Sequence, residues 1–203
     1  QCTLHGDVVV FVPEESRKGA QVVRKDASER EISLNPAVID YYIETTPATL
    51  HDSTGDLERV QAALADQHKL HNVTIDYRVL TELQNTVREG DWKLTVSVWN
   101  QGEIINVRPG RVKDGYGLAV DVGTTTVAGY LCSLSTGKIV ATHSMMNPQV
   151  AYGEDVMSRI SYATKSKKGL RTIHKAIIKG LNQIIAGTAK KARIKRTEIN
   201  DVV

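Results

Sequence analysis

The stretch "DVGTTT", which begins at Asp121, combines groups that can bind a phosphate. Gly123 lets the backbone approach a ligand closely, because glycine carries no Cβ. Successive backbone N–H groups in a tight turn form a concave surface that suits an anion, and the hydroxyls of Thr124, Thr125 and Thr126 add donors. Asp121 has the wrong charge to touch phosphate directly, but it can hold a Mg²⁺ ion through water. The stretch therefore predicts a Mg²⁺-phosphate site. The alternative is an ordinary turn in which the threonines are strand formers.

The residues around this stretch read as a small sheet. Gly117 to Asp121 and Thr125 to Leu134 have the apolar, β-branched composition of strands, and Lys138 to Ser144 reads as a third strand after a turn. Three consecutive strands joined by tight turns make an antiparallel meander. We therefore expect the candidate phosphate-binding groups at the turn between the first two strands.

Two helices and a further strand are predicted after this meander. The first helix covers "GEDVMSRISYAT", where acidic residues in the first turn suit capping and the helix dipole. The second covers "LRTIHKAIIKGLNQIIAGTAKKA", and its apolar residues share one stripe. That stripe consists of Leu170, Ile173, Ile177, Leu181, Ile184 and Ile185. The last residues, "EINDVV", read as the start of another strand.

The first half of the chain has a different pattern. Residues 7–12, "DVVVFV", read as a buried strand, and residues 13–35 read as a polar linker. Residues 36–110 then predict a small α+β unit of two helices and a sheet. Ser53 and Asp56 offer a capping box for the first helix, and Asp76 can cap the second. A hairpin is expected over "WKLTVSV" and "EIINV", with its turn at Asn100-Gln101-Gly102.

Composition narrows the class of protein. The chain has 203 residues, a net charge of +3 and 41% hydrophobic residues, which is enough for a packed core. No apolar run approaches the roughly 20 residues of a membrane span. No leader segment is visible, and two distant cysteines do not make a disulfide framework, so a reducing cytoplasmic location is expected. The start at Gln1 and the end inside an apolar strand suggest an internal fragment of a longer protein.

The second half is strongly basic. Residues 157–197 contain no Asp or Glu, whereas lysines and arginines recur along the long helix. Such a surface can bind nucleic acid, an anionic membrane or an acidic protein, or it can simply be solvated. The low aromatic content of 5% disfavours nucleic acid, so an acidic protein is the preferred partner of these classes.

The stretch "DVGTTT" between two apolar strands resembles the first phosphate loop of the actin-like ATPase superfamily. The longer stretch "AVDVGTTTVAGYLCSLSTGKIVATHSMMNPQVAYGEDVMSRI" closely resembles one branch, the ATP-dependent reductive activators of corrinoid proteins. The start, "QCTLHGDVVVFVPEESR", is similar to the end of the [2Fe–2S] domain of that family.

The resemblance implies a division of the chain into four parts. Residues 1–12 would end a ferredoxin-like domain, 13–35 would form a linker, 36–110 a middle α+β domain, and 111–203 the start of an actin-like ATPase domain with a ribonuclease H-like lobe. The expected fold class is therefore α/β together with α+β.

The resemblance also implies a function for the longer protein. A [2Fe–2S] cluster, for which Cys2 would be the last ligand, would pass an electron to a Co(II) corrinoid on a methyl-transfer protein, and ATP with Mg²⁺ would drive this reduction. Asp155 would lie near the nucleotide and orient water or hold the metal, unless it only caps a helix. The fragment alone is expected to be inactive. Whether the longer protein also pairs with a second copy of itself as a homodimer is left open.

Two other functions are left open by the residues. A small-molecule kinase of the same superfamily would use the same phosphate-binding stretch, but it needs no iron–sulfur domain. A non-catalytic basic binding module would account for the lysine-rich helix alone.

Cys132 alternates with Ala128 and Tyr130 along a predicted strand, and we interpret it as a small buried hydrophobic residue.

Overall fold

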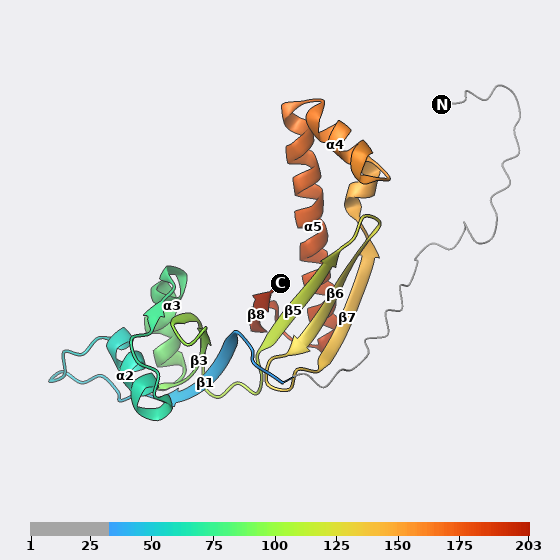
Figure 1. Ribbon diagram of the computed structural model, residues 1–203. Coiled ribbons are helices and arrows are strands. Elements are labelled where there is room, and N and C mark those ends of the chain that lie inside the picture. Colours follow the sequence, from blue (N-terminus) through green and yellow to red (C-terminus); the bar gives the residue numbers. More distant parts are fainter. Residues whose placement is uncertain (1–32) are drawn as a thin grey trace, which may run out of the picture.

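The computed structural model describes residues 33–203, which form two units that follow one another along the chain (Figure 1). Each unit contains a sheet of four strands. The predicted strand over residues 7–12, Cys2 and most of the predicted linker lie outside the described residues.

The first unit is a four-stranded sheet covered by two helices. Its elements are β1 (Val38–Glu44), α2 (Asp56–His68), β2 (Thr74–Ile75), α3 (Tyr77–Glu89), β3 (Lys93–Trp99) and β4 (Glu103–Pro109). The strand order is β1-β3-β4-β2, with β2 parallel to β4 and the other pairs antiparallel. Apolar side chains of β3 and β4 pack against those of α2 and α3, including Leu64, Leu83 and Leu94.

Local signals explain most of these elements, with one correction. The carboxylate of Asp76 accepts a hydrogen bond from the Arg78 N–H and caps α3 as predicted. The capping box predicted for Ser53 and Asp56 is wrong, because Gly55 is the N-cap of α2 and no side chain caps it. Asp56 lies inside the helix instead, and its carboxylate pairs with Arg88 of α3.

The second unit contains the candidate phosphate-binding stretch. Its elements are β5 (Tyr116–Val122), β6 (Thr126–Ser133), β7 (Ile139–Met146), the 3₁₀ helix η1 (Pro148–Tyr152), α4 (Val156–Thr164), α5 (Lys167–Ala192), the 3₁₀ helix η2 (Arg196–Glu198) and β8 (Ile199–Val202). The strand order is β7-β6-β5-β8. The three antiparallel strands confirm the predicted meander, and β8 pairs in parallel with β5.

The long helix α5 covers one face of this second sheet (Figure 1). Leu118, Val127, Leu131 and Ile184 form the buried centre of the contact between the sheet and the helix. Gly129 makes this close approach feasible, because a Cβ there would lie 2.3 Å from Cγ2 of Ile184. Of the predicted apolar stripe, Leu170 lies outside this contact, with 65% of its surface exposed near the start of α5.

A turn of 3₁₀ helix separates the meander from α4. We predicted that a helix begins at Gly153, and this start is wrong, because α4 begins at Val156, after η1 and a short turn. Asp155 is the N-cap of α4 and Ser158 completes a capping box with it. The fold class predicted from the sequence, α/β together with α+β, is confirmed, and the two sheets are separate.

A buried polar network joins the two units. The carboxylate of Asp40 on β1 accepts hydrogen bonds from the Ser97 hydroxyl at 2.6 Å and from the Arg108 guanidinium. Asn200 on β8 donates to the Ser97 hydroxyl at 3.1 Å and accepts from the Asn106 amide at 2.9 Å. The side chains of Arg108 and Asp40 are only 12% and 19% exposed, so this ion pair is largely removed from water. Removing one of its charges should therefore leave the other poorly compensated.

We expect Asp40→Asn to lower the free energy of unfolding of the chain by about 3 kcal/mol, because Arg108 loses its buried counter-charge. Asp56→Asn is the matched control, since it removes the same charge from an ion pair whose Arg88 side chain is 44% exposed. We expect the control to cost less than about 1 kcal/mol. Urea unfolding of the two variants measures both values, and equal losses would contradict the role assigned to the buried network.

Candidate functional site

The candidate site is the turn between β5 and β6, which we call the 121–126 loop after its residues. It lies at the end of the second sheet nearest α4 (Figure 1). The turn is closed by a hydrogen bond of 2.9 Å from the Gly123 N–H to the Thr126 carbonyl. A Cβ at Gly123 would lie 2.9 Å from that same carbonyl oxygen, so the turn has no room for a side chain at this position.

Three carbonyl groups of the 121–126 loop are bound by the segment that follows the meander. The Asn147 side-chain amide donates to the Gly123 carbonyl at 2.8 Å. The backbone N–H of Asn147 donates to the Thr125 carbonyl at 2.7 Å. Between them, the Arg159 guanidinium donates to the Thr124 carbonyl. The loop is therefore positioned from one side by two residues that lie far from it in the sequence.

This arrangement determines where the amide groups of the loop point. A trans peptide unit holds its C=O and N–H on opposite sides, and the described residues contain no cis peptide. Because the carbonyls of Gly123 and Thr124 face Asn147 and Arg159, the N–H groups of Thr124 and Thr125 are directed to the opposite side. Two successive N–H groups on one side of a turn are the elements of an anion-binding surface.

The two supporting side chains are buried and are themselves fixed by hydrogen bonds. Asn147 is 1% exposed and its amide oxygen accepts the Gln149 N–H at the start of η1. Arg159 is 8% exposed and its Nε donates to the Gly153 carbonyl at 2.8 Å. No local pattern in the sequence indicated a role for Arg159, which is 35 residues from its loop partner Thr124. Only the fold brings them together.

Asp121 is exposed near the end of β5 and lies on the face of the sheet away from α5. Alternation along β5 places it opposite Leu118 and Val120, which belong to the core beneath α5. Its partner in the β5–β6 ladder is Ala128. Mg²⁺ bound to nucleotides commonly uses one or two carboxylates together with phosphates and water. One exposed carboxylate close in the chain to the loop is of the type that this requirement names.

The three threonine side chains of the loop differ in how far they are exposed to solvent. Thr124 and Thr125 are exposed, whereas Thr126 is partly buried at the first position of β6. The hydroxyls of Thr124 and Thr125 are thus available to a ligand at the turn. The nucleotide-binding role of all three stays a prediction.

Asp155 has a structural role that accounts for its position. Its carboxylate accepts the Ser158 N–H at 2.8 Å, as the N-cap of α4. This hydrogen bond is the main reason why the pKa of Asp155 lies below its ordinary value, and the nearby charge of Arg159 contributes less. The side chain is exposed. A catalytic role for Asp155 stays a prediction, and helix capping is the alternative.

A cavity of about 340 Å³ lies between the loop, α4 and α5. The polar groups that line it come from Asn147, Gln149 and Arg159. Its apolar lining includes Val122, Val156, Ile160, Ala163 and Ile173. The cavity is therefore on the supporting side of the loop, and α4 is not tightly packed there.

The cysteines give no iron–sulfur site within the described residues. Cys2 lies outside them, so its predicted role as a cluster ligand stays a prediction. Cys132 is partly buried on β6, and burial raises the pKa of its thiol. Within residues 33–203, no three His, Cys, Asp or Glu side chains gather in a way that could bind a metal. A [2Fe–2S] cluster needs four ligands, so the two cysteines of this chain cannot hold it alone.

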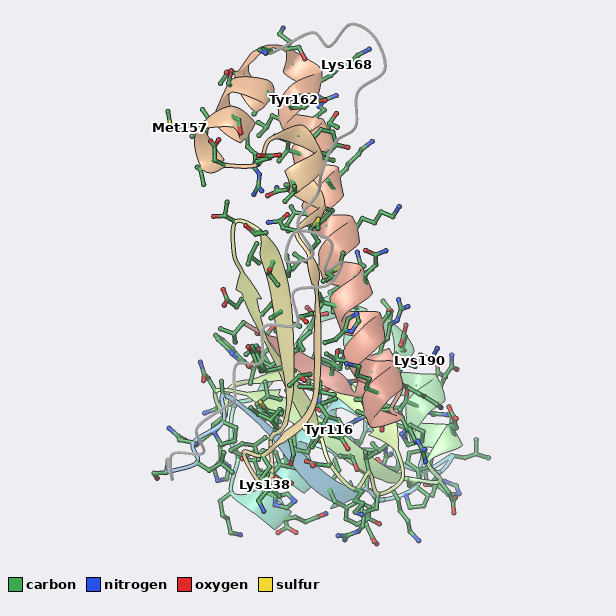
Figure 2. The ribbon with its side chains drawn as sticks, turned by 90° about the vertical axis from the view of Figure 1, so that its right-hand side faces the viewer. Tyr116, Lys138, Met157, Tyr162, Lys168 and Lys190 are labelled. Atoms are coloured by element: carbon green, nitrogen blue, oxygen red, sulfur yellow. The ribbon has the colours of Figure 1, made fainter. Side chains whose placement is uncertain are left out.

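The basic residues of the second half lie mainly on the outer surface of α5 and the following turn. Figure 2 labels Lys168 near the start of this helix and Lys190 near its end. Both are exposed, as are Lys175 and Lys179 between them. The apolar side of α5 packs on the sheet. Among the described helices, none is long and apolar enough to cross a membrane.

Comparison with known proteins identifies the family. Residues 27–114 match the family model described as the RACo linker region, and residues 116–203 match the RACo middle region. The chain belongs to the RACo family. The resemblance drawn from the sequence is thereby confirmed. These family descriptions assign the name linker to residues 27–114 and the name middle region to residues 116–203. The four-part division into domains that we drew from the sequence stays a prediction.

Two relatives carry descriptive names. The chain is 33% identical over 189 residues to the corrinoid activation enzyme RamQ of Eubacterium limosum. The matched region covers 92% of this chain and 31% of the relative. A solved structure named reductive activator for corrinoid, iron-sulfur protein matches with a TM-score of 0.67 and 30% identity. That match covers 84% of this chain and 28% of the other. The RACo chain described here thus spans less than a third of either relative.

We expect Gly123→Ala to destabilise the chain by about 1–3 kcal/mol, because the new Cβ would force the turn open against the Thr126 carbonyl. Gly102→Ala is the matched control. Gly102 also lies in a hairpin turn, but its Cβ would be 3.7 Å from the nearest atom, the Asn100 carbonyl oxygen. Thermal unfolding of both variants tests the expectation. If the two variants melted at the same temperature, the tight closure of the 121–126 loop would be refuted.

Proposed function

We propose that this chain is part of an ATP-dependent reductive activator of a corrinoid protein. Membership of the RACo family supports this proposal, as do the names of two relatives, one a corrinoid activation enzyme and one a reductive activator. Because the chain spans less than a third of those relatives, the activity is proposed for a longer protein of which these residues are a part.

The observation that carries the ATP part of the proposal is the geometry of the 121–126 loop. Carbonyls at Gly123 and Thr124 are bound by Asn147 and Arg159, and this directs two N–H groups outward. Donors fixed in advance of binding can stabilise the charge of a phosphate without reorganisation. In this proposal, Thr124 and Thr125 bind phosphate oxygens, and Asp121 holds Mg²⁺ through water. The metal would neutralise phosphate charge during transfer.

The redox part rests on family membership and on the start of the chain. In this proposal, the longer protein carries a [2Fe–2S] cluster with Cys2 as one ligand. The cluster supplies one electron, which reduces the Co(II) corrinoid of a methyl-transfer protein to Co(I). This reduction is energetically uphill, so it requires coupling to ATP. The cytoplasm as location, Asp155 as a catalytic residue and a homodimer as the assembly belong to the same proposal.

A small-molecule kinase is the second candidate, because it would use the same loop. The relatives are named as activators of corrinoid proteins, which favours the activator over the kinase. A purely basic binding module would require no preorganised loop, so the contacts of Asn147 and Arg159 count against it.

In the full-length protein, we expect Asp121→Asn to lower the rate of ATP hydrolysis about 10²-fold or more, because the charge that holds Mg²⁺ is lost. The melting temperature should change little, since Asn suits the same backbone. Asp66→Asn is the control, as it removes the same charge from an exposed position on α2. Wild-type hydrolysis in the Asp121 variant would refute the phosphate-binding role of the loop.

For the redox part, we expect Cys2→Ser in the full-length protein to remove or distort the visible absorption of the cluster and to abolish corrinoid reduction. Nucleotide binding should remain nearly intact, because in this proposal the cluster and the loop belong to separate domains. Cys132→Ser is the control, since that thiol is partly buried within β6. Unchanged absorption and reduction in the Cys2 variant would exclude Cys2 as a ligand.

A further inference from the structure

Arg159 connects the 121–126 loop directly to the start of α4, in addition to the contacts that Asn147 makes with the loop. Its Nη2 donates to the Thr124 carbonyl in the 121–126 loop, and its Nε donates at 2.8 Å to the Gly153 carbonyl in front of α4. The residue itself lies in the first turn of α4. A change in the orientation of the Thr124 peptide would therefore displace the Arg159 side chain, and with it the start of this helix.

Arg159 is a buried charged residue that forms no ion pair within residues 33–203. It is 92% buried, and burying a charge is costly unless a counter-charge compensates it. The ion pairs found in residues 33–203 involve Arg59, Arg88 and Arg108, but not Arg159. Its guanidinium donates to the neutral carbonyls of Gly153 and Thr124, and the exposed carboxylate of Asp155 lies nearby without forming an ion pair with it. A phosphate on the outer side of the loop would add a negative charge beyond the peptide that Arg159 binds.

Helix α4 has room to respond. The cavity of about 340 Å³ borders Val156 and Ile160 on one side of the helix. On its outer side, Met157 is 73% exposed and points away from the rest of the molecule (Figure 2). A helix that packs closely on only part of its surface can shift at low cost, whereas a fully packed one cannot.

We infer that Arg159 is a positioning residue that couples phosphate binding at the 121–126 loop to the position of α4. It orients the Thr124–Thr125 peptide so that its N–H meets the phosphate, and it transmits the resulting movement of the Thr124 carbonyl to the helix. This coupling rests on the proposed function, because it needs a phosphate ligand at the loop. It provides a route by which nucleotide state changes a surface some distance from the nucleotide.

The test measures backbone amide hydrogen exchange in the full-length protein with and without saturating Mg·ATP. In the wild type, exchange should change both at residues 124–126 and across α4. In Arg159→Gln, Mg·ATP should bind about tenfold more weakly or worse, because a charged hydrogen-bond donor is lost. At saturation, exchange at the loop should still change in this variant, but exchange in α4 should not. Arg159→Lys, which keeps the charge, should restore part of the affinity and provides a second variant if Arg159→Gln does not fold.

Arg171→Gln is the matched control, since it removes the same group from an exposed position on α5. It should leave both the affinity and the exchange response of α4 unchanged. If Mg·ATP binds to the wild type and alters exchange at the loop while α4 does not respond, the coupling is overturned and the proposed function stands. The coupling is also overturned if α4 responds equally in Arg159→Gln. A wild-type protein that does not bind Mg·ATP would instead overturn the proposed function itself.

Discussion

The planarity of the trans peptide is the constraint on which the candidate site depends. A peptide unit whose carbonyl is bound on one side must present its N–H on the other. In the 121–126 loop, Asn147 and Arg159 bind the carbonyls from the side of α4, so the N–H groups of Thr124 and Thr125 face the other side. The supporting side chains therefore set the orientation that the proposed anion site requires, and the loop sequence alone does not set it.

That support requires the segment after the meander to be fixed in place. Helix α5 approaches the sheet closely at Gly129, and Gln149 of η1 donates to the Ile173 carbonyl of α5 at 3.3 Å. The core beneath α5 thus fixes the position of η1, and η1 fixes Asn147. The polar network around Asp40 adds a second connection, because it attaches the first unit to β8 beside β5. The loop is consequently the end of a continuous set of contacts through both units.

Local patterns in the sequence were sufficient for the loop and the meander. An apolar run, a glycine and consecutive hydroxyl residues are neighbours in the chain, and strands joined by tight turns are recognisable from alternation. The contact between Arg159 and Thr124 could not be predicted, because it joins residues that only the fold brings together. The capping box at Ser53 failed for a related reason: the start of α2 is set by packing and by the pairing of Asp56 with Arg88, which the local motif does not contain.

The central claim is that the outward N–H groups of the 121–126 loop bind phosphate. The most direct measurement is a crystal structure of the full-length protein with Mg²⁺ and a non-hydrolysable ATP analogue. We expect a phosphate oxygen within about 2.7–3.2 Å of the backbone nitrogen of Thr124 or Thr125, with the metal separated from Asp121 by water. A nucleotide bound elsewhere, with no phosphate oxygen near either nitrogen, would contradict the claim.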